Sequence, residues 1–111
     1  MAYDEGLAQR VREEMSGFPG YAEKTMFGGI GFLLHGNMAG GVIGDSLIVR
    51  VGQGEYENAL AEPHTRSFDM TGRPMRGWVV VTAHGYESDE DLANWIERGV
   101  AYALTLPAKA Q

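Results

Sequence analysis

Residues 26–51 read MFGGIGFLLHGNMAGGVIGDSLIVRV, and this stretch decides the fold. It combines apolar runs with two short turn signals, Gly36-Asn37 and Gly44-Asp45. Apolar runs separated by two residues of this kind are typical of β-hairpins. The stretch therefore predicts a three-stranded antiparallel meander. It contains no recognisable set of reacting groups.

Two-residue turns fix which side chains of the meander share a face. They place Ile30 opposite Ile43, and Val42 opposite Leu47. One face is then wholly apolar, and we assign it to the core: Phe27, Leu33, Met38, Val42, Leu47, Val49 and Val51. The second face is also largely apolar, with Met26, Ile30, Phe32, Leu34, Ala39, Ile43 and Ile48 beside Ser46 and Arg50.

The second face needs a cover, because a sheet with one wet face alternates apolar and polar residues. Either the helices divide between the two faces, or the second face is a subunit interface or a ligand groove. We expect a homodimer, since one self-complementary patch serves both subunits. The candidate interface residues are Ile30, Phe32, Ile43, Ile48 and Arg50.

The segments on either side of the meander supply helices and two more strands. Apolar residues at every fourth position predict an amphipathic helix over 3–15, and a loop over 16–23 follows. A short helix is expected over 55–61, a weak strand over 65–70 and a strong strand over 78–83. The order of elements therefore begins with a helix, three strands, a short helix and two strands.

The last element is a long helix that begins after Ser88 and ends before Pro107. Ser88 and Asp91 have the spacing of a capping box, and the acidic first turn suits the helix dipole. An apolar stripe that includes Trp95 and Ile96 should be buried. The complete order, α-β-β-β-α-β-β-α in 111 residues, predicts a single α+β domain, residues 1–111, with an antiparallel sheet of about five strands.

Composition limits the possible functions. Fifteen acidic and nine basic side chains give a net charge of −6, which argues against direct nucleic-acid binding. The chain has no cysteine, and we find neither a secretion signal nor an apolar run long enough to cross a bilayer. We therefore expect a cytoplasmic protein that does not enter the membrane.

A cluster of basic residues keeps one alternative open. Four arginines fall in the second half of the sheet region, and with Phe32 or Trp78 they would form a small-ligand or nucleic-acid site: Arg50, Arg66, Arg73 and Arg76. The simpler interpretation is that they are solvated turn and edge residues. Convergence of the four on one surface would favour the binding site.

No pattern of catalytic or metal-binding residues emerges. The glycines of Gly29-Ile30-Gly31 precede apolar residues and a turn, whereas a phosphate loop needs a helix N-terminus after it. His35, His64 and His84 lack metal-ligand spacing. We expect no enzyme, no cofactor and no metal site, and we interpret the chain as an interaction module.

Two motifs resemble a known family. Residues 24–38 and 72–78 contain its characteristic positions: Lys24, Met26, Phe27, Gly28, Gly29, Gly31, Phe32, Gly36, Met38, Gly72, Arg73, Pro74, Met75 and Trp78. The sequence resembles the N-terminal domain of the TfoX (Sxy) competence-regulator family over nearly its whole length. The resemblance implies an α+β fold similar to secretion chaperones, which often dimerise, and a regulatory, protein-binding role. It implies no catalytic residue.

Overall fold

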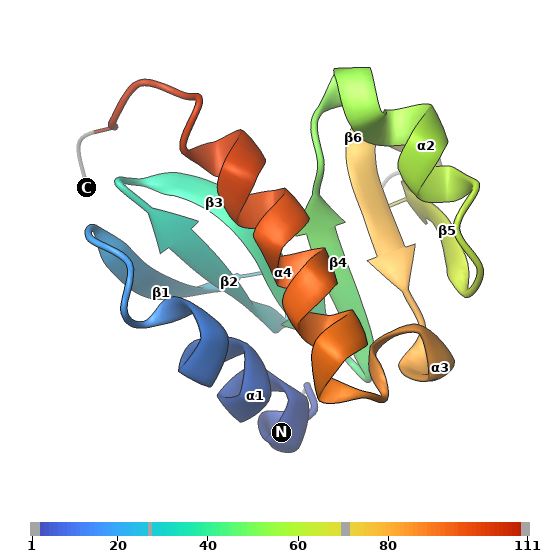
Figure 1. Ribbon diagram of the computed structural model, residues 1–111, viewed down its shortest axis with the longest axis horizontal. Helices are drawn as coiled ribbons and strands as arrows, with labels where there is room; N and C mark the ends of the chain where they lie inside the picture. Colours follow the sequence, from blue (N-terminus) through green and yellow to red (C-terminus); the bar gives the residue numbers. More distant parts are fainter. Residues whose placement is uncertain (1–2, 27, 70–71, 110–111) are drawn as a thin grey trace.

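A computed structural model describes residues 3–26, 28–69 and 72–109. Within these residues the chain forms a six-stranded antiparallel sheet with the strand order β1-β2-β3-β4-β6-β5 (Figure 1). The strands are β1 Tyr21–Met26, β2 Gly29–Leu34, β3 Asn37–Ile43, β4 Ser46–Arg50, β5 Thr65–Asp69 and β6 Pro74–Val81. The α+β prediction is confirmed, and β2, β3 and β4 are the predicted meander.

Four α-helices and one 3₁₀ turn lie within the same residues: α1 Glu5–Met15, a turn at Gln53–Glu55, α2 Tyr56–Leu60, α3 Ala83–Tyr86 and α4 Asp89–Ala103. Both long helices have N-caps, which supply acceptors for N–H groups that the helix leaves unpaired. The Asp4 carboxylate accepts from the Leu7 amide at 3.1 Å. The Ser88 hydroxyl accepts from the Asp91 amide at 3.0 Å, which confirms the predicted start of the last helix.

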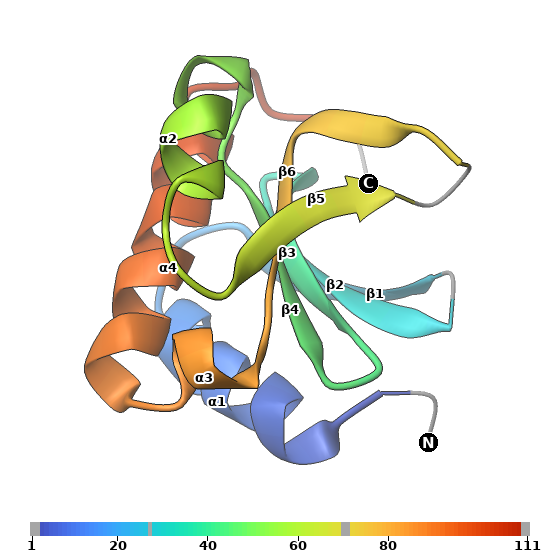
Figure 2. The same cartoon turned by 90° about the vertical axis from the view of Figure 1, so that its right-hand side faces the viewer.

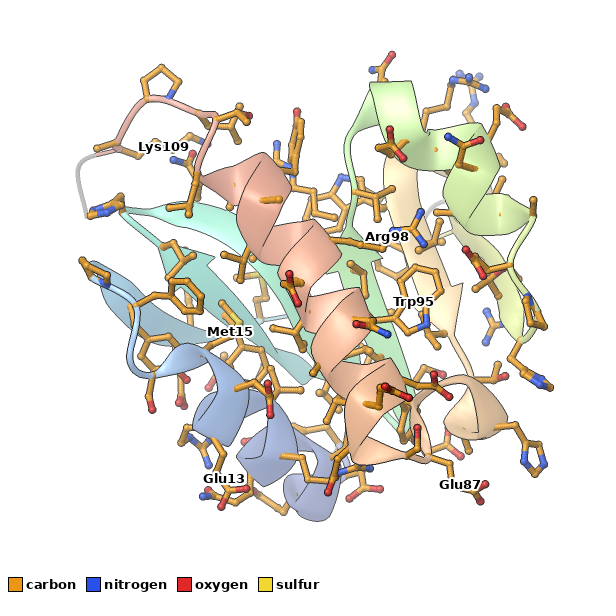
Figure 3. The ribbon with its side chains drawn as sticks, viewed as in Figure 1. Glu13, Met15, Glu87, Trp95, Arg98 and Lys109 are labelled. Carbon is orange, nitrogen blue, oxygen red and sulfur yellow. The ribbon has the colours of Figure 1, made fainter. Side chains whose placement is uncertain are left out.

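The helices cover one face of the sheet. Figure 2 shows α1, α2, α3 and α4 together on one side, with the strands on the other. Trp95, Ile96 and Val100 of α4 are 7%, 6% and 4% exposed, so the predicted stripe is buried. Met15 projects from the end of α1 toward the sheet (Figure 3) and is also buried. The core is therefore the layer between the helices and the sheet.

The turn between β2 and β3 differs from the prediction by one residue. Leu34 pairs with Asn37, so the turn residues are His35 and Gly36, with φ values of 52° and 82°. Positive φ at both central residues is the type I′ geometry that suits a tight hairpin. The register then shifts because Leu33 pairs with Met38 but Phe32 pairs with Gly40, leaving Ala39 as a bulge.

A one-residue change of register moves side chains to the opposite face. Ile30 pairs with Val42 rather than Ile43, so each side chain of β2 points to the face opposite the predicted one. Ile30, Phe32, Leu34 and Ala39 therefore belong to the core, whereas Leu33 does not. The second hairpin is as predicted, since Ile43 pairs with Ser46 and Val42 with Leu47.

Other boundaries also differ. The predicted loop over 16–23 contains the start of β1, which becomes an edge strand because Tyr21 pairs with Leu34. The strand predicted over 78–83 begins earlier, at Pro74, and the short helix α3 follows it. Predictions that involve Phe27, Met70 and Thr71 lie outside the described residues. Within the described residues, none of the helices is both long and apolar enough to span a bilayer.

Both ends of the described chain are attached to turns of the meander. The Asp4 amide donates to the Gly44 carbonyl at 2.7 Å, and the Tyr86 hydroxyl donates to the Asp45 carbonyl at 2.6 Å. At the other turn, the Lys109 amide donates to the His35 carbonyl at 2.8 Å. The buried Asn37 side chain donates to the Pro107 carbonyl at 2.8 Å. The meander is thus the attachment point for both ends.

Candidate functional site

The sheet face turned away from the helices is the candidate site, and we call it the open face. Side chains alternate between the faces of a strand, so the strand pairings assign them. The open face carries Ala22, Lys24, Met26, Gly29, Gly31, Leu33, Met38, Gly41, Ile43, Ser46, Ile48, Arg50, Arg66, Phe68, Trp78 and Val80. None of the described helices covers this face (Figure 2).

Glycines of β2 and β3 leave room for methionine side chains on the open face. A Cβ atom built on Gly31 would lie 2.9 Å from the Met38 methyl carbon and 3.1 Å from that of Met26. A Cβ on Gly41 would lie 3.3 Å from the same Met38 atom. Both methionines are half-buried, and their flexible thioether chains adapt readily to a partner surface.

The middle of the open face is nevertheless buried. Ile48 and Val80 are each 2% exposed, although no described helix lies over them. The partly exposed apolar side chains surround them: Met26, Leu33, Met38, Ile43, Phe68 and Trp78. A partner would therefore contact this surrounding set, and Ile48 would contribute through the packing beneath it.

Arg50, the last residue of β4, packs against two aromatic rings. The Arg50 guanidinium carbon is 5.1 Å from the ring centroid of Trp78 and 5.3 Å from that of Tyr102. The Arg50 Nη1 also donates to the Met38 carbonyl at 3.5 Å. Trp78 in turn lies 6.3 Å from the Phe68 ring, between centroids. Cation–π contacts of this kind hold a guanidinium in place without neutralising it.

The predicted interface residues divide between the two faces. Ile43, Ile48 and Arg50 lie on the open face, as expected. Ile30 and Phe32 do not, because the bulge at Ala39 turns β2 over. They are 6% and 0% exposed and belong to the core beneath the helices. Their assignment to the second face was wrong, and Leu33 and Met38 take their places.

The four arginines of the predicted ligand site do not converge. Arg50 and Arg66 lie on the open face, whereas Arg76 turns toward α2, where it is 3.6 Å from the Glu57 carboxylate and 5.0 Å from the Tyr56 ring centroid. Arg73 is exposed in the connection between β5 and β6. The predicted aromatic neighbour Trp78 does contact Arg50, but Phe32 is in the core.

Sequence reasoning missed several residues of the open face, including Leu33, Met38 and Phe68. A signal for Phe68 was present. Arg66 and Phe68 are two residues apart in β5, as Trp78 and Val80 are in β6, so all four side chains are expected on one face when Arg66 pairs with Val80. For Leu33 and Met38 no such signal was present, because the bulge at Ala39, and not the position of the turn, brings them to the open face.

The strongest perturbations of acid–base groups lie elsewhere, beside α1. Arg12 donates to the Glu23 carboxylate at 2.5 and 3.1 Å, and the Tyr21 hydroxyl donates to the same group. The hydrogen bonds from Arg12 lower the pKa of Glu23, the Tyr21 hydrogen bond adds to this, and partial burial opposes it. Burial and the hydrogen bond to Glu23 raise the pKa of Tyr21. This cluster ties α1 to the edge strand β1.

Histidines and carboxylates offer no metal centre in the part of the chain that the structure describes. His64 and His84 are neighbours, with ring centroids 5.6 Å apart, and both are exposed. A pair of exposed imidazoles without a third ligand is a weak metal site.

Comparison with known proteins gives one match. The family model described as the TfoX N-terminal domain matches residues 13–103. The match includes both motifs noted in the sequence and extends from α1 into the last turn of α4. Searches of curated proteins and of solved structures found no match. The match confirms the resemblance that the two motifs indicated.

Proposed function

The chain belongs to the TfoX N-terminal domain family, and on that premise we propose that it is a non-enzymatic protein-interaction module that binds a protein partner through the open face. One observation carries the proposal: the described helices all pack on one side of a six-stranded sheet, and the other side presents partly exposed Met, Ile, Leu, Phe and Trp side chains. Apolar surface rimmed by charge is common at protein interfaces.

The chemistry of the site also supports a role in binding rather than catalysis. The largest pKa shifts belong to Arg12, through its hydrogen bonds to Glu23, and to Tyr21, through burial and its hydrogen bond to Glu23, so both have a structural explanation. Arg50 is the best-positioned charged group of the open face, and a guanidinium that remains protonated is a poor general acid or base. An arginine beside aromatic rings is instead a common binding element.

A pair of matched variants tests which face binds. Ile43 is half-buried at the end of β3 on the open face, and Ala101 is exposed on α4 on the opposite side. We expect a protein captured from a lysate of the source cells by the wild-type chain to be retained by Ala101→Glu and lost by Ile43→Glu. Equal retention by both variants, or loss with Ala101→Glu alone, would contradict the proposal.

A second copy of the chain is the alternative occupant of the open face, as the sequence suggested. Leu33, Met38 and Ile43 favour it because they are apolar and partly exposed. Lys24, Arg50 and Arg66 oppose it, because a two-fold axis brings the same charges of both copies to one interface. We therefore place a different protein first and the homodimer second.

Sedimentation equilibrium separates these two occupants. A homodimer through the open face would appear at about 10–100 μM, where even a modest interface associates, and Ile43→Glu would convert it to a monomer. A wild-type chain that remains monomeric in that range excludes the second copy. Ile48 is unsuitable as a probe, because a charge at a side chain that is 2% exposed would destabilise the fold itself.

A further inference from the structure

We propose that the partner of the open face is an acidic protein segment in which carboxylates alternate with apolar side chains. This inference rests on the proposed function and adds the chemistry of the partner. The chain carries a net charge of −6, yet the charged residues that the strand pairings assign to the open face are Lys24, Arg50 and Arg66, with no carboxylate among the described residues there.

Four of the remaining arginines have partners within the protein, whereas Arg73 is exposed in the connection between β5 and β6. Arg10 pairs with Asp89, Arg12 with Glu23, and Arg98 with Glu62, at 3.3, 2.5 and 3.4 Å. Arg76 is 3.6 Å from Glu57. The three cations of the open face pair with no carboxylate in the described parts of the chain. Charges interact over about 8–10 Å at physiological ionic strength, so this face is locally positive on an acidic protein.

Arg50 is already held in position for a carboxylate. Its guanidinium lies over Trp78 and Tyr102, and one of its nitrogens donates to the Met38 carbonyl. A guanidinium has five N–H donors in a fixed plane, so donors remain for a bidentate carboxylate. Because the rings restrict the side chain before binding, less conformational entropy is lost when the complex forms.

The apolar part of the segment would lie beside this charge. Trp78 and Phe68 provide an aromatic surface next to Arg50, which also contacts the backbone of Met38. Arg66 is exposed on the same face as Phe68 and is available to a second carboxylate. A segment of about ten residues extends over about 33 Å, which is comparable with the 29–32 Å extents of the molecule.

Other occupants suit these features less well. Three cations would release few counterions from a polyphosphate, while the net negative charge opposes its approach. A second copy would bring the cations of both open faces, and no carboxylate of the described residues there, into one interface. An acidic peptide carries fewer charges than a nucleic acid of equal length and offers apolar side chains to the methionines and aromatic rings.

Fluorescence of a single tryptophan tests the proposal. Trp78 and Trp95 are the two tryptophans, and Trp95→Phe leaves Trp78 as the reporter on the open face. The probe is a synthetic peptide of about ten residues that alternates Glu with Leu and Phe, compared with versions in which Gln or Lys replaces Glu. We expect the acidic peptide to change Trp78 emission with a Kd of about 100 μM or tighter, and added salt to weaken it.

Matched charge variants locate the contact. Arg66→Gln should weaken binding about fivefold or more, because it removes a charged donor from the open face. Arg98→Gln is the control, since it removes the same charge from the side where Arg98 pairs with Glu62. Arg50→Gln should weaken binding further. Arg66 is the safer test because it is exposed and Arg50 packs against two rings.

The outcomes separate the inference from the proposed function. If the Gln peptide binds as tightly as the Glu peptide and Trp78 still responds, the acidic chemistry is wrong but the open face remains a protein-binding surface. If an oligothymidine of about ten nucleotides binds more tightly than any peptide, the partner is a single-stranded nucleic acid and both proposals fail. If Trp78 responds to no peptide while the fold stays intact, the acidic segment is excluded, and the comparison of Ile43→Glu with Ala101→Glu decides the proposed function separately.

Discussion

At the scale of single residues, close packing between two backbone segments requires glycine at certain positions. Gly99 of α4 faces β3, and a Cβ atom there would lie 2.3 Å from the Ala39 carbonyl oxygen. A backbone oxygen cannot move aside as a flexible side chain does, so the helix itself would have to shift. The glycine therefore sets how closely α4 approaches the bulge of β3.

We expect Gly99→Ala to destabilise the protein by about 1–3 kcal/mol, the usual cost of inserting a carbon into a packed contact. The better helix propensity of alanine, about 1 kcal/mol, offsets only part of the clash. Urea unfolding measures the difference. Gly17→Ala is the control, because a Cβ atom at Gly17 meets nothing within 4 Å. A higher midpoint for Gly99→Ala would contradict the close packing.

The carboxylate of Glu23 gives a prediction about pH. Its pKa is lowered chiefly by the hydrogen bonds from Arg12, so the native state holds its proton less tightly than the unfolded chain. The stabilisation is therefore complete above the ordinary pKa of about 4.3 and is lost as the pH falls through the lowered native value.

Removing that carboxylate should make the free energy of unfolding less dependent on pH in the acidic range. Glu23→Gln is expected to be less stable than wild type by at most about 1 kcal/mol at neutral pH, because the pair is partly solvated, and the difference should shrink below about pH 4. Urea unfolding at several pH values measures it. Glu14→Gln, an exposed neighbour on α1, should show no such convergence.

At the scale of elements, the amphipathic helices and the second hairpin could be predicted from the sequence. The β3–β4 turn follows the common pattern of Gly-Asp between apolar runs, and α4 has both a cap and an apolar stripe. The β2–β3 turn could not be placed, because His35 adopts a φ of 52° that histidine seldom shows. The sequence around Ala39 does not indicate a bulge, so every residue of β2 was assigned to the wrong face of the sheet.

The buried apolar stripe of α4 can be tested at Trp95. Trp95 is 7% exposed, and the Arg98 guanidinium lies 4.7 Å from its ring centroid on the side of α4 that faces β6 and α2 (Figure 3). Trp95→Ala should cost about 3–5 kcal/mol, enough to threaten a domain of ordinary stability. Thermal unfolding followed by circular dichroism tests it. Leu104→Ala, at a side chain that is 51% exposed, should change stability little.

At the scale of the whole molecule, the arrangement of charge matters more than its sum. Composition gives the net charge of −6, but only the strand pairings show that the open face is free of described carboxylates. The sequence also could not show that the helices gather on one side, because that depends on tertiary packing. Three of the five predicted interface residues, Ile43, Ile48 and Arg50, thus lie on the open face, and their part in an interface stays a prediction.

The same charge balance predicts weak binding to duplex DNA. We expect no complex with a fluorescently labelled duplex below about 10 μM protein at about 0.15 M salt, because few cations are present to displace counterions. Fluorescence anisotropy measures it. Submicromolar binding that weakens steeply with salt would show instead that Arg50 and Arg66 contact phosphates.

The attachment of both chain ends to the turns of the meander has a consequence for how the molecule opens. Terminal segments ordinarily fray independently of the rest of a domain. Here the Asp4 amide is held by Gly44 and the Lys109 amide by His35, so releasing either end also frees a hairpin turn. Local opening at the termini is thereby coupled to opening of the central hairpins. In hydrogen exchange, these amides should belong to the same cooperative unit as β3, although they lie more than 100 residues apart in the chain.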